Sequence, residues 1–216
     1  MSFEDFVSNI SFEDLKKINE EFHKQQKNIP TYQYSKIKDS DLDEIVNIEK
    51  NIENMNSILI SDYSEEDLKA NFIIPLINRV DFFLLDKKIR GFYEEKLTYK
   101  NDKFILNGTL DFVVSKGLLK SKEPYFFIQE FKRGEEFSNP RPQLLAEMIS
   151  AVELNSIKFM RGAYVIGAIW NFVILEKLGE NSYQYFVSSN FDSTKIEDLK
   201  DIYKNLLFIK SLLLKI

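Results

Sequence analysis

The sequence of 216 residues predicts an α/β protein with a mixed central sheet flanked by helices. Three observations support this fold class. Apolar residues recur at helical spacing in the N-terminal third of the chain, and after Gly91 the apolar period shortens to the alternation that is typical of strands. One helical segment then interrupts the strands, and an amphipathic helix follows the last of them.

The N-terminal part predicts a helical extension over residues 1–60, followed by an α/β core over residues 61–216. Apolar residues lie three or four positions apart in residues 12–22 and again in 42–59, so each set forms one stripe along a helix. The second stripe is narrow. It is expected either to pack on the core or to contact a second copy of the chain or a partner protein.

A third helix is expected to begin after Ser64, whose hydroxyl is a suitable N-cap. Three acids follow at residues 65–67, where the positive end of the helix dipole favours negative charge. Pro75 lies inside this helical pattern and should kink or restart the helix, because proline has no N–H to donate.

Strands are expected where the pattern alternates or becomes continuously apolar. Asn107 and Gly108 form a dipeptide that is typical of a turn between two strands. Pro140 and Pro142 introduce an amphipathic helix. In chain order, the expected elements are strands within 92–100, 103–115 and 124–132, a helix within 143–155, strands within 162–178 and 183–189, and a helix from 194 to the end.

The charge distribution permits contact with nucleic acid without requiring it. The chain has a net charge of −5, but residues 39–67 hold ten acids and one base, so residues 68–216 are weakly basic. The sequence has no cysteine, no leader-like N-terminus and no apolar stretch of membrane-spanning length. A cytoplasmic protein that does not associate with membranes is therefore expected.

Residue types exclude several kinds of catalytic chemistry. Without cysteine and with His23 as the single histidine, zinc sites and Ser-His or Cys-His nucleophilic systems are not expected. Residues 162–167 have the glycine spacing of a phosphate loop but lack the lysine that follows it, and their apolar filling predicts a strand. An enzyme built from this sequence would use carboxylates, lysines and a hard metal ion.

One Glu-x-Lys triplet stands out among the six Asp/Glu-x-Lys triplets of the chain. Glu130 and Lys132 follow the apolar run "YFFI" directly, whereas the other triplets lie in helices, near a helix end or in a less apolar strand. Residues two apart in a strand project from the same face, so these two side chains should lie together, with Gln129 and Phe131 on the opposite face. A buried charge needs a partner or a metal ion.

Asp111 is a second acid in an apolar strand. Simple alternation places Leu110, Phe112 and Val114 on one face of this strand, and Asp111 with Val113 on the other. Two carboxylates on neighbouring strands would suit Mg²⁺, or Mn²⁺ in its place. A lysine beside them could orient a water or stabilise charge on a phosphate. The alternative is a structural Asp–Lys or Glu–Lys bridge at a sheet edge.

Four motifs in order resemble those of a known family. The segments "SEEDLKANFIIPLI", "GTLDFVV", "FFIQEFKR" and "RPQLLAEM" resemble the motifs of the PD-(D/E)XK nuclease superfamily, which has a restriction-endonuclease-like fold. They are most similar to the N-terminal nuclease domain of type I restriction enzyme R subunits. The likeness covers about residues 61–155. One departure is Leu110, which stands where the family has a proline.

The resemblance implies a Mg²⁺-dependent nuclease that hydrolyses phosphodiester bonds, with DNA as the expected substrate and restriction, defence or DNA processing as the setting. It implies that Asp111 and Glu130 bind the metal and that Lys132 serves the attacking water. Glu65, or Glu66 one residue on, would be the third acid. Gln143 would be a polar accessory to the metal, water or phosphate. The alternative function is a catalytically silent restriction-endonuclease-like fold that binds nucleic acid or protein.

Overall fold

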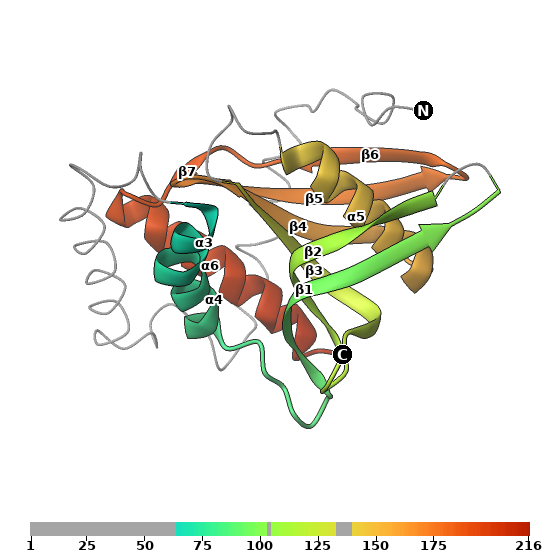
Figure 1. The fold of residues 1–216 in the computed structure, drawn as a ribbon, viewed down its shortest axis with the longest axis horizontal. Helices are drawn as coiled ribbons and strands as arrows, with labels where there is room; N and C mark the ends of the chain where they lie inside the picture. The colour runs from blue at the N-terminus through green and yellow to red at the C-terminus, as the bar shows by residue number, and fades with distance from the viewer. Residues whose placement is uncertain (1–63, 103–104, 133–139) are drawn as a thin grey trace. The chain divides into compact units, whose positions relative to one another are not determined.

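The computed structural model describes residues 64–102, 105–132 and 140–216 (Figure 1). The helices expected within residues 1–60 lie outside the described residues. The described chain divides into two compact units. Unit 1 comprises residues 82–166 and 171–188, and unit 2 comprises residues 64–81, 167–170 and 189–216.

The order of elements follows the order expected from the sequence. The elements are α3 (Glu65–Leu68), the π-helical turn η3 (Lys69–Ile73), α4 (Ile74–Val80), β1 (Ile89–Lys100), β2 (Ile105–Lys116), β3 (Lys122–Lys132), α5 (Pro140–Asn155), β4 (Phe159–Ile166), β5 (Ile169–Gly179), β6 (Ser182–Val187), β7 (Phe191–Asp192) and α6 (Ile196–Leu213).

The strands form a seven-stranded sheet in the order β1-β2-β3-β4-β5-β6, with β7 paired to β5. The pairs β1–β2, β2–β3 and β5–β6 are antiparallel, whereas β3 and β4 run parallel with Glu130 opposite Tyr164. The parallel pair needs a crossover connection, which α5 supplies. The expected α/β class with a mixed sheet is therefore confirmed.

Helix α5 packs closely on one face of the unit 1 sheet (Figure 1). A Cβ atom placed on Gly162 of β4 would lie 2.9 Å from the sulfur of Met148 and 3.0 Å from the carbonyl oxygen of Ile128. The absence of a side chain at Gly162 therefore lets the helix approach the strand. This contact sets the height of α5 above β3. Residues 162–167 belong to β4 and its end, as expected from their apolar filling.

The alternation of side chains between the two faces of the β1–β2 hairpin is interrupted at one position. The ladder passes from Tyr93 opposite Phe112 to Glu95 opposite Leu110 and skips the pair formed by Glu94 and Asp111. Glu94 has a φ of 54°, in the left-handed region. As a result, Leu110 belongs to the same core cluster as Val113, and Phe112 does not. The expected grouping of Leu110 with Phe112 and Val114 is thus wrong, because simple alternation fails at this bend.

The Asn-Gly signal does not mark a turn. Asn107 and Gly108 lie inside β2, opposite Thr98 and Leu97, and the ladder of the hairpin continues past them to Lys100 opposite Ile105. The dipeptide favours a two-residue turn only where the flanking strands pair with each other across it. Here both of its flanks pair with β1 instead.

Unit 2 is helical apart from β7 and the start of β5. The Ser64 hydroxyl accepts a hydrogen bond from the backbone N–H of Asp67 at 3.0 Å, as expected of an N-cap. The helix then widens into η3, and α4 begins with Pro75 in its first turn, so the proline restarts the helix. The ammonium of Lys210 in α6 is buried and donates to the carbonyl oxygen of Val80 at 2.8 Å.

Candidate active site

Asp111 lies where β2 separates from β3. The β2–β3 ladder ends with Phe112 opposite Gln129, so Asp111 is the first residue of β2 beyond the pairing. Its Oδ2 accepts a hydrogen bond from the backbone N–H of Phe131 at 2.8 Å. This satisfies a backbone donor of β3 that lies beyond the end of the β2–β3 ladder. The side chain is only 8% exposed. The fork between the strands thus holds a buried carboxylate.

Glu130 and Lys132 project together from β3, as the strand period predicted. The Lys132 ammonium lies 2.8 Å from Glu130 Oε1. Glu130 is completely buried, and its Oε2 has no hydrogen-bond partner among the described residues. An unsatisfied buried acceptor is costly, so the arrangement leaves a polar position to fill.

The electrostatics of Glu130 reflect its position next to a second acid. Burial, reinforced by the negative charge of Asp111, raises the pKa of the Glu130 carboxyl to about 8, although Lys132 acts in the opposite direction. Desolvation and a like charge both disfavour the ionised form. A cation placed between Glu130 and Asp111 would reverse this effect.

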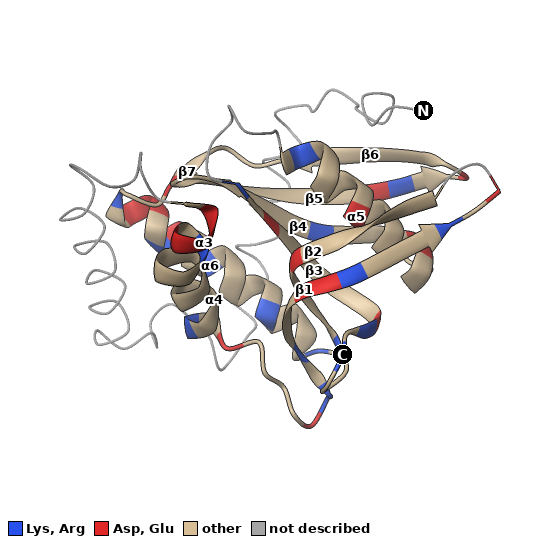
Figure 2. Cartoon of the chain, viewed as in Figure 1, with Lys and Arg blue, Asp and Glu red and all other residues tan. Residues whose placement is uncertain are grey.

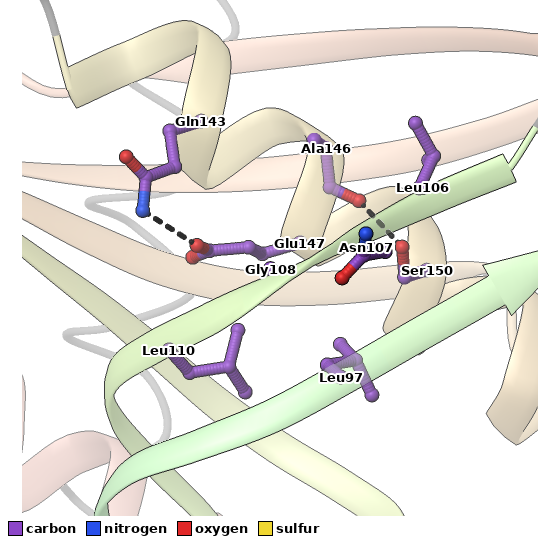
Figure 3. A pocket seen from close by; sticks show the side chains of 9 residues that line it. All are labelled: Leu97, Leu106, Asn107, Gly108, Leu110, Gln143, Ala146, Glu147 and Ser150. Carbon is purple, nitrogen blue, oxygen red and sulfur yellow. Dashed lines mark hydrogen bonds between the residues drawn. The ribbon is translucent and has the colours of Figure 1, made fainter.

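Gln143 lies on α5, and its side-chain hydrogen bond is with Glu147 rather than with Asp111 or Glu130. It is exposed, and its Nε2 donates to Oε1 of Glu147, one turn further along the helix, at 3.1 Å (Figure 3). Gln143 is therefore connected to the site through Glu147. Glu147 was not among the site residues expected from the sequence.

Glu147 is a third buried acid of unit 1. It is 6% exposed, and its Oε2 has no hydrogen-bond partner among the described residues. Burial first, and then the charge of Glu130, raise the pKa of its carboxyl to about 9. Asp111 raises it further, whereas Gln143 and Lys132 lower it. These couplings place Glu147 within electrostatic range of the β2–β3 fork.

A signal for Glu147 was present in the sequence. It is a single acid inside the apolar run "LLAEMISAV", which is the same kind of anomaly that pointed to Asp111. It also lies four residues after Gln143 and therefore on the same helix face. Neither pattern by itself connects Glu147 to the Glu-x-Lys strand, because the two segments meet only in the folded chain.

Glu65 and Glu66 lie in unit 2. Glu65 is in the first turn of α3 and forms an ion pair with Lys69 at 3.2 Å, and Glu66 is exposed. Both positions suit the positive end of a helix dipole. A role for either residue as the third acid of the site stays a prediction.

A metal ion would find two suitable carboxylates at the fork and no complete cage. Within the described residues, no three or more Asp, Glu or His side chains are grouped so that they could hold a metal ion. Mg²⁺ needs no such cage, because it is commonly held by one or two carboxylates, waters and substrate phosphates. The unpartnered Oε2 of Glu130 beside Asp111 fits this mode of binding.

Elsewhere in the sheet, β1 carries acidic and basic side chains side by side (Figure 2).

No protein-family model, curated protein or solved structure matches the chain. In the part of the chain that the structure describes, no helix is long and apolar enough to cross a membrane.

Proposed function

We propose that the protein is a Mg²⁺-dependent nuclease with a restriction-endonuclease-like PD-(D/E)XK centre, and that DNA is its substrate. The observation that carries the proposal is the junction of Asp111, Glu130 and Lys132 at the β2–β3 fork. There a buried carboxylate oxygen lacks a partner, and an ammonium lies 2.8 Å from the same carboxyl group. A surface ion pair at a sheet edge would not need a second acid beside it.

Asp111 and Glu130 would hold the ion, Mg²⁺ or Mn²⁺. When bound, the ion polarises a phosphate oxygen and lowers the pKa of a coordinated water. Asp111 is already oriented by the N–H of Phe131, so its other carboxylate oxygen has a fixed direction. Glu130 must lose its proton before it can act as a ligand, because the pKa of its carboxyl is about 8.

Lys132 has the role of positioning the attacking water and of stabilising charge on the phosphate. The Lys132 side chain is 17% exposed, whereas that of Glu130 is fully buried, so Lys132 lies at the rim of the buried acids. Charge-assisted contacts of this kind act where charge develops in the transition state. Lys132 would exchange its contact with Glu130 for one with the water or the phosphate.

The test is cleavage of DNA and RNA, each single-stranded and double-stranded, with Mg²⁺, Mn²⁺ or EDTA. Lys132→Ala and Asp111→Asn should abolish metal-dependent cleavage, and Lys132→Ala should keep DNA affinity within a few-fold. Lys96→Ala is the matched control, because Lys96 ends the other Glu-x-Lys triplet of a strand and is not fully buried. Wild-type protein that cuts none of these substrates, or a Lys132→Ala variant that cuts normally, would refute the nuclease.

A catalytically silent binding module is the second candidate. The specific observation in its favour is that the Lys132 ammonium already lies 2.8 Å from Glu130 Oε1 and that no preformed metal cage exists among the described residues. This candidate predicts DNA or protein binding that is the same with Mg²⁺ and with EDTA. The same panel distinguishes it, provided that binding is measured alongside cleavage.

A further inference from the structure

A cavity of about 290 Å³ lies between α5 and the β1–β2 hairpin, within unit 1 (Figure 3). Leucine side chains from the two strands and polar side chains from β2 and α5 line it. The residues that matter here are Leu97, Leu106, Leu110, Asn107, Gln143 and Glu147. A volume near the lower end of the roughly 300–1,000 Å³ typical of ligand sites suits one small ligand group.

Glu147 makes this cavity more than a packing defect. Its side chain lines the cavity and is more than nine-tenths buried, and its Oε2 has no partner among the described residues. Gln143 holds the other carboxyl oxygen at 3.1 Å, so the side chain has a fixed direction. A polar atom on a ligand would satisfy Oε2, which has no partner among the described residues.

Gly108 leaves the strand side of the cavity open. A Cβ atom built on Gly108 meets no atom within 4 Å, although Gly108 lies in the middle of β2. A glycine inside a strand is unfavourable and often marks a place where a ligand approaches the backbone. The open space at Gly108 lies next to the leucines that line the cavity.

The cavity adjoins the proposed active site. Leu110 lines the cavity, and the next residue is Asp111 at the β2–β3 fork. The charges of Glu130 and Asp111 also act on Glu147, which lines the cavity as well. A phosphodiester held at the fork would therefore have a neighbouring nucleoside close to the cavity.

We propose that the cavity receives the base of an unpaired nucleotide beside the phosphodiester to be cleaved, so that the substrate is single-stranded or frayed nucleic acid. This inference rests on the proposed function for the position of the phosphate. The leucines pack against the faces of the base, and Glu147 Oε2 forms a hydrogen bond with a polar atom at its edge. Inside a duplex that edge is already paired, and extruding a base costs a few kcal/mol.

The experiment measures binding of a short fluorescent DNA strand and of its duplex to the full chain. Ca²⁺ replaces Mg²⁺ so that cleavage does not interfere. Gly108→Leu fills the cavity from β2, where the added Cβ atom meets no other atom, and Ala146→Met fills it from α5 if the first variant folds poorly. Thr109→Leu is the matched control, because Thr109 is exposed, alternates with Gly108 along β2 and does not line the cavity.

Wild-type protein should bind the single strand at least about tenfold more tightly than the duplex, as one well-packed base contact implies. Gly108→Leu or Ala146→Met should remove most of this preference, and Thr109→Leu should keep it. Equal binding of strand and duplex, or a preference that survives both filling variants, would overturn the inference. Cleavage assays separate the two proposals: a single-strand preference without any metal-dependent cleavage retains the cavity and rejects the nuclease. Metal-dependent cleavage that the filling variants leave unchanged retains the nuclease and rejects the cavity as a base site.

Discussion

Replacing Glu147 by glutamine should change how the stability of the metal-free protein depends on pH. Both Glu130 and Glu147 are buried, and the pKa values of their carboxyls are raised from 4.5 to about 8 and about 9. In the unfolded chain both groups ionise near their ordinary pKa. At a pH between the unfolded and the folded pKa of a carboxyl, the folded protein holds one more proton at that carboxyl than the unfolded chain does.

The sign and size of the effect follow from linkage. A carboxyl whose folded pKa is raised stabilises the fold at low pH, and this contribution is lost as the pH rises toward the folded pKa. Each carboxyl lowers the free energy of unfolding by about 1.4 kcal/mol per pH unit in the window from about pH 5.5 to 7.5. Glu130 and Glu147 together should therefore cost about 5 kcal/mol across that window, and Glu147→Gln should reduce the loss to about 3 kcal/mol.

The assay is urea denaturation of the full chain with EDTA at several pH values in this window. The window is favourable because the chain contains a single histidine and no cysteine, so few other groups titrate there. Glutamine at position 147 keeps an oxygen to accept from Gln143 and nearly the same shape. Glu180→Gln removes an exposed carboxyl and should leave the wild-type slope unchanged. If Glu147→Gln shows the wild-type slope, Glu147 is ionised in the folded protein and the electrostatic description of the site is wrong.

Three further perturbations test other features. Mg²⁺ should raise the melting temperature more at pH 8 than at pH 6, because binding competes with protonation, and Asp111→Asn should remove this shift; a pH-independent shift would contradict the proposed site. Gly162→Ala should lower the free energy of unfolding by about 1–3 kcal/mol, because its Cβ would lie 2.9 Å from the sulfur of Met148, and wild-type stability in urea would show that α5 can shift. Ser64→Ala should cost about 1 kcal/mol in the same assay through loss of the helix cap, whereas Ser64→Thr keeps the hydroxyl and should retain most of the stability.

Much of the fold was predictable because its signals are local. The amphipathic period of α6, the cap at Ser64 and the restart at Pro75 each depend on a few neighbouring residues. The pairing of Glu130 with Lys132 was also predictable, because strand geometry alone places residues two apart on one face. The site could be assembled from the sequence only as far as such local rules extend.

The remaining features depend on partners that are distant in sequence. The role of Glu147 requires α5 to cross above β3, and the close approach at Gly162 that fixes this crossing has no local signature. The face on which Leu110 lies depends on the skipped pair between Glu94 and Asp111. Propensity cannot indicate such a bend, since an ordinary glutamate adopts the left-handed conformation there only because the surrounding ladder holds it.

The skipped Glu94–Asp111 pair also governs how this hairpin can vary in length. Beyond it, β1 and β2 continue as a paired ribbon as far as Lys100 and Ile105. Inserting one residue between the bend and Gly108 would turn Gly108 and Leu106 away from α5, because side chains alternate along a strand. Insertions of two residues would preserve their direction, and changes at the tip would leave Asp111 in place. Natural variation in this ribbon should therefore collect at the tip or occur in even steps.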